Sequence, residues 1–113
     1  MIVQKAWGTE EWLENDKEAN HCRKILTINP GWVSSVHYHP IKRETFILMQ
    51  GLVVFAMQGR EYRMYPGGVV YVATGTRHAF WNSAVWPAQV LEISTYHDDA
   101  DVVRLSQSRR LEP

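Results

Sequence analysis

Turn-forming residues divide this sequence into many short runs of strand-forming residues. Glycine recurs between the runs, as in Asn29-Pro30-Gly31, Gln58-Gly59 and Pro66-Gly67-Gly68. The runs themselves are rich in valine, isoleucine and aromatic residues, which favour strands. Short strands that alternate with glycine-containing turns indicate an all-β sandwich or barrel.

These breaks also predict where the elements lie. Strands are expected over residues 22–29, 32–38, 44–50, 52–57, 60–65, 69–72, 77–81 and 88–96. Residues 1–20 are expected to form a strand or an arm, followed by a turn. Acidic residues open Asp98–Leu105, and the helix dipole favours negative charge at a helix N-terminus. We therefore expect one or two helical turns there, and a loose tail over residues 106–113.

Histidine and glutamate residues gather in the segment Gly31–Gly51. His37 and His39 are two residues apart in a predicted strand, so both side chains leave the same face. Glu44 opens the next strand, and His78 follows a turn further along the chain. Three imidazoles and a carboxylate form a ligand set for one divalent transition metal ion (Mn, Fe, Co, Ni or Zn) and leave two positions of an octahedral ion open.

The spacing of these residues resembles both sequence motifs of the cupin family. The first motif reads Gly31, five residues, His37-x-His39, four residues, Glu44, six residues, Gly51; the second runs from Gly67 through Gly75 and His78 to Asn82, with Ala73 in place of the usual proline. The resemblance implies a single cupin domain over residues 1–113, folded as a double-stranded β-helix or jelly-roll barrel. Its barrel core would span about residues 22–97, with an N-terminal arm (1–21) and a C-terminal tail (98–113).

Strand alternation predicts which residues surround such a site. If the four ligands point inward, the same face carries Ser35, Phe46, Leu48, Phe80 and Asn82, so we expect a mostly apolar cavity. The opposite face carries Val36, Tyr38, Ile47 and Met49, which is too apolar for a face in water. The N-terminal arm or a second subunit must cover it. We predict a homodimer, and the resemblance points the same way because cupins often dimerise through a sheet.

Other polar residues have two interpretations each. Lys42 and Arg43 lie in the loop between the ligand strands, where a cation can hold an anionic substrate, but a solvated loop charge is the favoured interpretation. Glu92 lies in the last long strand; facing inward it is a candidate general base, and facing outward it is an edge residue. His21 and His97 are interpreted as surface residues rather than ligands.

A second resemblance concerns function. The WG near the N-terminus, the two motifs, and PAQVLEIS followed by DDADVVRL resemble the cupin region of mannose-6-phosphate isomerases and mannose-1-phosphate guanylyltransferases. Glu92 matches their glutamate in that strand. The resemblance implies a metal-dependent cupin of carbohydrate metabolism, most concretely an aldose–ketose sugar isomerase with Glu92 as the base and a metal-stabilised enediolate. The alternatives are an iron-dependent dioxygenase and a non-catalytic metal- or sugar-binding module.

Composition narrows the expected partners and location. Twelve acidic and twelve basic residues balance, so no basic stripe indicates nucleic acid, and no apolar run is long enough to cross a membrane. We therefore expect a small-molecule substrate, a sugar or sugar phosphate. The single cysteine, Cys22, and the lack of a signal-peptide core in the first residues favour the cytoplasm.

Overall fold

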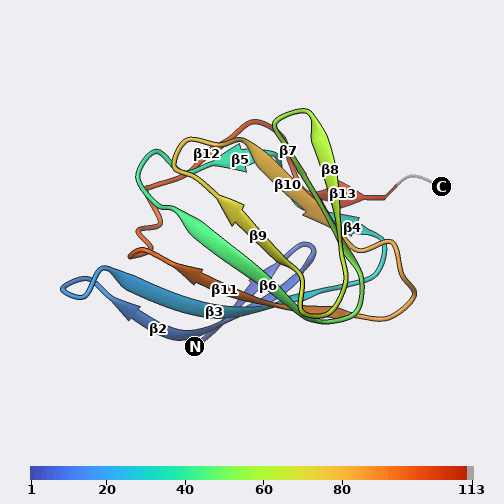
Figure 1. Cartoon of the computed structure of the whole chain (residues 1–113), viewed down its shortest axis with the longest axis horizontal. Helices are drawn as coiled ribbons and strands as arrows, with labels where there is room; N and C mark the ends of the chain where they lie inside the picture. The colour runs from blue at the N-terminus through green and yellow to red at the C-terminus, as the bar shows by residue number, and fades with distance from the viewer. Residues whose placement is uncertain (112–113) are drawn as a thin grey trace.

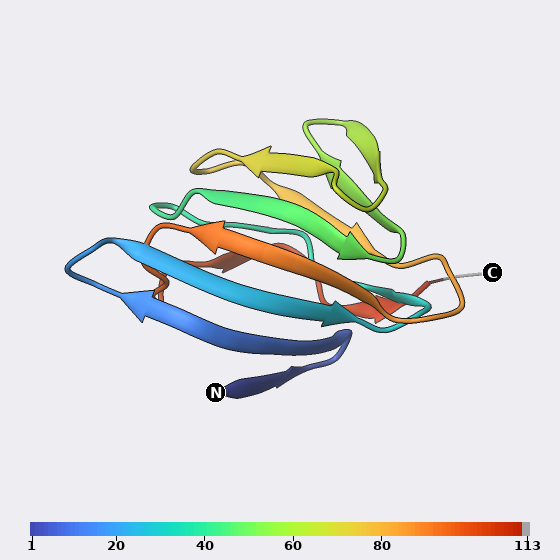
Figure 2. The ribbon, with the colours of Figure 1, turned by 60° about the horizontal axis from the view of Figure 1, so that its bottom comes forward.

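The structure, a computed structural model, describes residues 1–111 of the chain. These residues form two antiparallel sheets that pack face to face (Figure 1). The first sheet contains, in spatial order, β1 (Ile2–Lys5), β2 (Gly8–Asp16), β3 (His21–Ile28), β11 (Ala88–Ser94), β6 (Glu44–Gln50) and β9 (Val69–Val72). These strands lie side by side in Figure 2.

The second sheet is built from shorter strands. It contains β12 (Val103–Arg104), β5 (His37–Tyr38), β10 (His78–Trp81), β4 (Trp32–Val33) and β13 (Arg109–Arg110), and β10 also pairs with β7 (Val53–Met57), which pairs with β8 (Arg60–Met64). The prediction of an all-β chain is confirmed. No helix occurs within residues 1–111, and therefore none in that range can span a membrane.

The two sheets enclose a core whose side chains change from apolar to charged across the first sheet, from β6 to β3. Phe46 and Leu48 on β6 are buried against Phe55, and the Phe46 and Phe55 ring centroids lie 4.8 Å apart. Full burial of a side chain of this size stabilises the fold by roughly 1.5–3 kcal/mol. On the same inner face, however, Lys24 and Glu92 are directly opposite each other on β3 and β11, and both are almost fully buried. The cavity described below lies at this polar end.

The N-terminal segment, predicted as a strand or an arm, forms β1 and β2 at one edge of the first sheet. Trp7 is buried and packs edge-on against Phe80, with ring centroids 5.0 Å apart. Gly8 starts β2 with a φ of +152°, and a Cβ at this position would lie 1.8 Å from the carbonyl oxygen of Thr27. Only glycine therefore lets β2 approach β3 this closely.

The predicted continuous strand over residues 32–38 is wrong, because residues 34–36 separate β4 from β5. Side-chain hydrogen bonds there supplement backbone bonds made by Ser34 and Val36. The Ser34 hydroxyl accepts a hydrogen bond from the Phe80 amide at 3.0 Å, and the Ser106 hydroxyl accepts one from the Val36 amide at 2.8 Å. The chain is thereby fixed in an irregular conformation immediately before the histidines.

The predicted helical turns over Asp98–Leu105 are also wrong. The Asp101 amide donates to the Asp98 carbonyl at 2.8 Å, which closes a single turn. The Asp101 carboxylate then accepts the backbone amides of Ile41 and Lys42 at 2.9 and 2.8 Å, so the chain is tied to the loop before β6 and continues as β12 rather than as a helix.

The predicted loose tail is corrected in the same way, because residues 109–110 form β13 and pair with β4. The Leu111 amide also donates to the Gly31 carbonyl at 2.7 Å. The last two residues of the predicted tail, Glu112 and Pro113, lie outside the described residues.

Candidate metal centre

Three histidines converge where β5 and β10 meet. His37 on β5 is paired directly with His78 on β10, and His39 follows β5 by one residue. One ring nitrogen from each of the three histidines lies within 4.8 Å of the corresponding nitrogens of the other two. This cluster can hold a metal ion, as the spacing of the histidines in the sequence predicted.

Hydrogen bonds to backbone carbonyls fix the tautomer of all three rings. Nδ1 of His37 lies 2.9 Å from the Ser35 carbonyl, Nδ1 of His39 lies 2.7 Å from the Asp101 carbonyl, and Nδ1 of His78 lies 2.9 Å from the Thr76 carbonyl. A carbonyl oxygen can only accept, so each Nδ1 carries the proton and each Nε2 keeps its lone pair. This arrangement is the usual support of metal-binding histidines.

Glu44 faces two of the three histidines. Its Oε1 lies 3.3 Å from Nε2 of His39 and 3.4 Å from Nε2 of His78. Both Oε1 of Glu44 and Nε2 of His78 are buried without a hydrogen-bond partner among the described residues. Lone pairs facing lone pairs at this distance are unfavourable unless a cation lies between them.

The distances from Oε1 of Glu44 to Nε2 of His39 and of His78 agree with a shared cation. Metal–ligand bonds of about 2.0–2.2 Å bring neighbouring ligand atoms to roughly 3–3.6 Å of each other, depending on the coordination geometry. The residues present therefore fit a divalent transition metal ion.

Protonation favours the same conclusion. Burial, with the neighbouring His78 acting in the same direction, lowers the pKa of His37 to about 3. Burial also lowers the pKa of His39, more than Glu44 raises it. The pKa of Glu44 is below its ordinary value because the contacts with His78 and Lys42 outweigh the effect of burial. Neutral imidazoles and an ionised carboxylate are the forms that bind metals.

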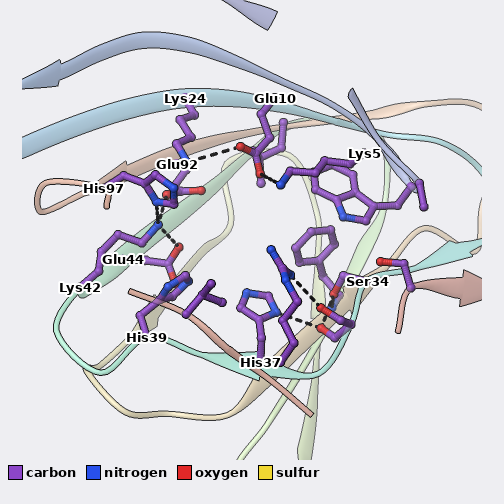
Figure 3. Close-up of a pocket in the computed structure, with 18 of the residues that line it drawn as sticks. Lys5, Glu10, Lys24, Ser34, His37, His39, Lys42, Glu44, Glu92 and His97 are labelled. Carbon is purple, nitrogen blue, oxygen red and sulfur yellow. Dashed lines mark hydrogen bonds and ion pairs between the residues drawn. The ribbon is translucent and has the colours of Figure 1, made fainter. Parts of the chain in front are cut away.

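The interpretation of Lys42 as a solvated loop charge is wrong. The residue is 3% exposed, and its Nζ lies 3.4 Å from Oε2 of Glu44 and 3.3 Å from Oε2 of Glu92 (Figure 3). Burial lowers its pKa, but Glu92 and Glu44 raise it more. Its neighbour Arg43 is exposed, as expected. The backbone amide of Lys42 is held by Asp101, and this contact turns the side chain inward.

Glu92 faces inward and lines the cavity, but its contacts differ from those of Glu44. Its Oε2 accepts a hydrogen bond from Lys42, whereas Oε1 has no hydrogen-bond partner within residues 1–111. Burial raises the pKa of Glu92, Lys42 opposes this effect, and Glu44 adds to it. The result is a buried carboxylate with one free oxygen beside the histidine cluster. Its role as a catalytic base stays a prediction.

His97, interpreted as a surface residue, is instead part of the cavity lining. Its Nδ1 accepts a hydrogen bond from Lys42 at 2.9 Å, so its proton is on Nε2, which donates to Asp99 at 2.8 Å. This tautomer is opposite to that of the three clustered histidines. Burial lowers the pKa of His97 to about 4, and the charges of Lys42 and Lys24 act in the same direction.

The cavity has a volume of about 420 Å³, within the range of roughly 300–1,000 Å³ that small-ligand sites occupy. Ser35, Phe46 and Phe80 line it as predicted, whereas Leu48 and Asn82 are buried in the core instead. Asn82 has a structural part: its side chain donates to the carbonyls of Ile28 and Trp86 at 2.9 and 2.8 Å.

The cavity is more polar than the mostly apolar one that was predicted, because charged residues supply much of the lining. The cations are Lys5, Lys24, Lys42 and Arg104, and the anions are Glu10, Glu44, Glu92 and Asp99. Sequence reasoning missed Lys5, Glu10 and Lys24 altogether. Alternation along residues 22–28 could have placed Lys24 on the buried face with Leu26, but the contribution of β1 and β2 to the cavity had no such signal.

Comparison with known proteins decides the family. The family of cupin domains (Cupin_2) matches residues 24–94, more than half of the chain. The chain belongs to the cupin family. The fold of this cupin is accordingly shared with solved structures: oxalate decarboxylase from Bacillus subtilis, studied for its Mn(II) centres, superposes with a TM-score of 0.76 at 21% identity over 92% of this chain and 29% of that one.

Two further similarities involve sugar-related proteins. A cupin from Silicibacter pomeroyi described as a sugar phosphate isomerase has a TM-score of 0.69 at 20% identity, covering 88% of this chain and 76% of that one. A putative mannose-1-phosphate guanylyltransferase from Vibrio cholerae is 24% identical over 102 residues, which is 88% of this chain and 22% of the relative. The chain spans less than half the length of the curated relatives it matches.

Proposed function

We propose that this cupin is a metal-dependent enzyme of carbohydrate metabolism, most concretely an aldose–ketose isomerase acting on a sugar or sugar phosphate. The observation that carries the proposal is the position of Glu92. It is a buried carboxylate that lines the same cavity as His37 and His39 and has one oxygen without a hydrogen-bond partner within residues 1–111. The similarity to proteins described as a sugar phosphate isomerase and a mannose-1-phosphate guanylyltransferase supports the substrate class.

In this proposal His37, His39, His78 and Glu44 hold one divalent transition metal ion, with Mn, Fe, Co, Ni and Zn all compatible with the ligand set. When bound, such an ion supplies Lewis acidity toward the carbonyl and adjacent hydroxyl oxygens of a sugar. Glu44 is committed to this role because its Oε1 faces two imidazole nitrogens. A second carboxylate is therefore required for proton transfer.

Glu92 is that second carboxylate. It takes a proton from the carbon beside the carbonyl and returns it to the neighbouring carbon, while a hydroxyl proton moves between the two oxygens of the substrate. Lys42 holds Oε2 at 3.3 Å and thereby leaves Oε1 for the substrate. A raised pKa suits a carboxylate that must accept a proton near neutral pH.

The test is turnover by metal-loaded protein on a panel of aldoses and their phosphates, followed anaerobically by NMR. We expect Glu92→Gln to lower kcat by about 10²- to 10⁴-fold with unchanged metal content. Glu61→Gln, an exposed position on β8, is the matched control. Full turnover by Glu92→Gln would exclude it as the base. Iron together with substrate-dependent oxygen consumption would indicate a dioxygenase, and binding without turnover would indicate a sugar-binding module.

We further propose that the protein acts as a homodimer in the cytoplasm on a small molecule, without nucleic-acid or membrane partners. Support for the dimer comes from the outer face of the first sheet. Val69 and Tyr71 on β9 are 60% and 54% exposed there, beside the half-buried Ile47 and Leu91 of the adjoining strands. Apolar surface that continues across neighbouring strands favours a second subunit.

A further inference from the structure

A second polar cluster, formed by Lys5, Glu10 and Lys24, lines the cavity on the side away from the histidines (Figure 3). Its residues come from β1, β2 and β3, and two of them precede the segment that matches the cupin family. β2 lies three strands from β6, which corresponds to about 14 Å along the sheet. Groups on β2 therefore face the far end of a ligand that reaches the histidine cluster.

The carboxylate of Glu10 is held firmly by its neighbours. Its Oε1 accepts hydrogen bonds from the Trp12 indole at 3.0 Å and from the Lys24 ammonium at 3.4 Å. Lys24 is itself 1% exposed and lies 4.3 Å above the Trp12 ring. Burial raises the pKa of Glu10, but Lys24 and Lys5 lower it more, so the group is ionised near neutral pH. Its orientation is thus set before any ligand binds.

The other oxygen of Glu10 is not satisfied in this way. Oε2 lies 4.0 Å from Nζ of Lys5, which is too long for a hydrogen bond, and it has no other hydrogen-bond partner within residues 1–111. An oxygen atom about 2.8 Å from both groups would make an angle of roughly 90° between them. A hydroxyl group fits this gap, because it can accept from the ammonium and donate to the carboxylate at the same time.

We propose that Glu10 and Lys5 form a specificity pair that binds a hydroxyl group of a sugar or polyol at the end of the cavity away from the histidines. An anionic end group fits less well, because the carboxylate is between the two lysines and repels it. The role of the pair in an isomerase substrate complex rests on the proposed function. Binding of the hydroxyl group itself does not.

The test is calorimetric titration of the metal-loaded protein with mannose, 4-deoxymannose, 6-deoxymannose and mannose 6-phosphate. Glu10→Gln and Lys5→Met are compared with Glu11→Gln, the adjacent exposed position on the same strand, and with Lys17→Met, an exposed lysine in the following turn. We expect mannose to bind at least about tenfold more weakly to Glu10→Gln and several-fold more weakly to Lys5→Met, with both controls unchanged. At least one deoxy sugar should bind the wild type more weakly than mannose does, and that difference should vanish in Glu10→Gln.

Any of the following three results would refute the proposed role of Glu10 and Lys5. Equal binding of mannose to Glu10→Gln and Glu11→Gln would show that the carboxylate makes no contact with the sugar. Tighter binding of mannose 6-phosphate to Glu10→Gln would show that the lysines bind an anion. No binding of any of the four compounds to the wild type would exclude the ligand class. Binding with the expected variant pattern but without turnover would refute the isomerase and leave the pair intact.

Discussion

Replacement of Lys42 by methionine tests whether the buried charges are arranged as described. The ammonium is the shared partner of Glu44, Glu92 and His97, at 3.4, 3.3 and 2.9 Å. Removal of one partner of a buried ion pair typically costs about 3–5 kcal/mol. The pKa of Glu92 is already raised, so this carboxyl can take up a proton and relieve part of the cost. We therefore expect Lys42→Met to lose about 3 kcal/mol, near the lower end of that range.

The measurement is thermal and urea unfolding in the presence of a chelator, because a bound metal would compensate the charge of Glu44. A loss of 3 kcal/mol corresponds to a fall in Tm of about 12 °C for a domain of this size. Arg43→Met is the matched control, since Arg43 is the next residue and is exposed. It should change stability by less than about 0.5 kcal/mol.

The double variant Lys42→Met/Glu92→Gln decides the cause. Removing the carboxyl of Glu92 should restore about 1–2 kcal/mol relative to Lys42→Met, because the single variant must either protonate this buried carboxyl or keep it ionised beside Glu44, and the double variant does neither. If the double variant is no more stable than Lys42→Met, the loss is due to packing of the lysine stem and the electrostatic reasoning fails. A change in Lys42→Met as small as that in Arg43→Met would refute the burial of the charge.

Three further predictions concern the metal, the pH dependence and the assembly. His37→Ala and His78→Ala should each lower metal affinity at least about 100-fold, since loss of supporting residues alone costs about 10- to 100-fold. Elemental mass spectrometry of each protein purified without added metal measures the metal content. Undiminished metal in both variants would place the site elsewhere. Because the pKa of His97 is lowered from 6.5 to about 4, the unfolded chain binds more protons between these values and stability falls as pH decreases through them. After allowance for the partial exposure of His97, the fall in unfolding free energy from pH 7 to pH 4.5, measured by urea unfolding, should be about 1–2 kcal/mol smaller in His97→Asn than in the wild type. An equal fall in both proteins would contradict the lowered pKa of His97. Light scattering should give a dimer for the wild type and a monomer for Val69→Asp, whereas a monomeric wild type would exclude the interface.

The three histidines of the candidate metal centre were the easiest part to predict from the sequence. His37 and His39 have a spacing that strand geometry converts directly into a shared direction, and His78 follows a turn that returns the chain to them. The local hydrogen bonds of their Nδ1 atoms involve carbonyls only two residues away for His37 and His78. Short-range geometry is encoded locally, so residue spacing is sufficient to detect it.

The residues that were misjudged depend on contacts distant in sequence. Lys42 points inward because Asp101, 59 residues further along, binds its backbone amide. The same aspartate prevents the expected helix, because its carboxylate is already bonded to the loop before β6. His97 is part of the cavity lining because Lys42 donates to it across 55 residues. A pattern along one segment carries no information about contacts between residues that are distant in sequence. The composition of the loop before β6 therefore predicted an exposed charge correctly only for Arg43.

The cavity is therefore assembled from two sources. The histidines, Glu44 and Glu92 all lie within residues 24–94, the part that matches the cupin family. Lys5 and Glu10 precede that part, and Arg104 follows it, yet they line the same cavity. Solved cupins at 15–22% identity share the fold with this chain, and a shared fold does not by itself determine the substrate. If the metal-binding residues supply the chemistry, selectivity must come from the groups that meet the rest of the substrate, and β1, β2 and the segment after β11 provide these. Under the proposed function, substitutions there should change which sugar binds while leaving the metal content intact.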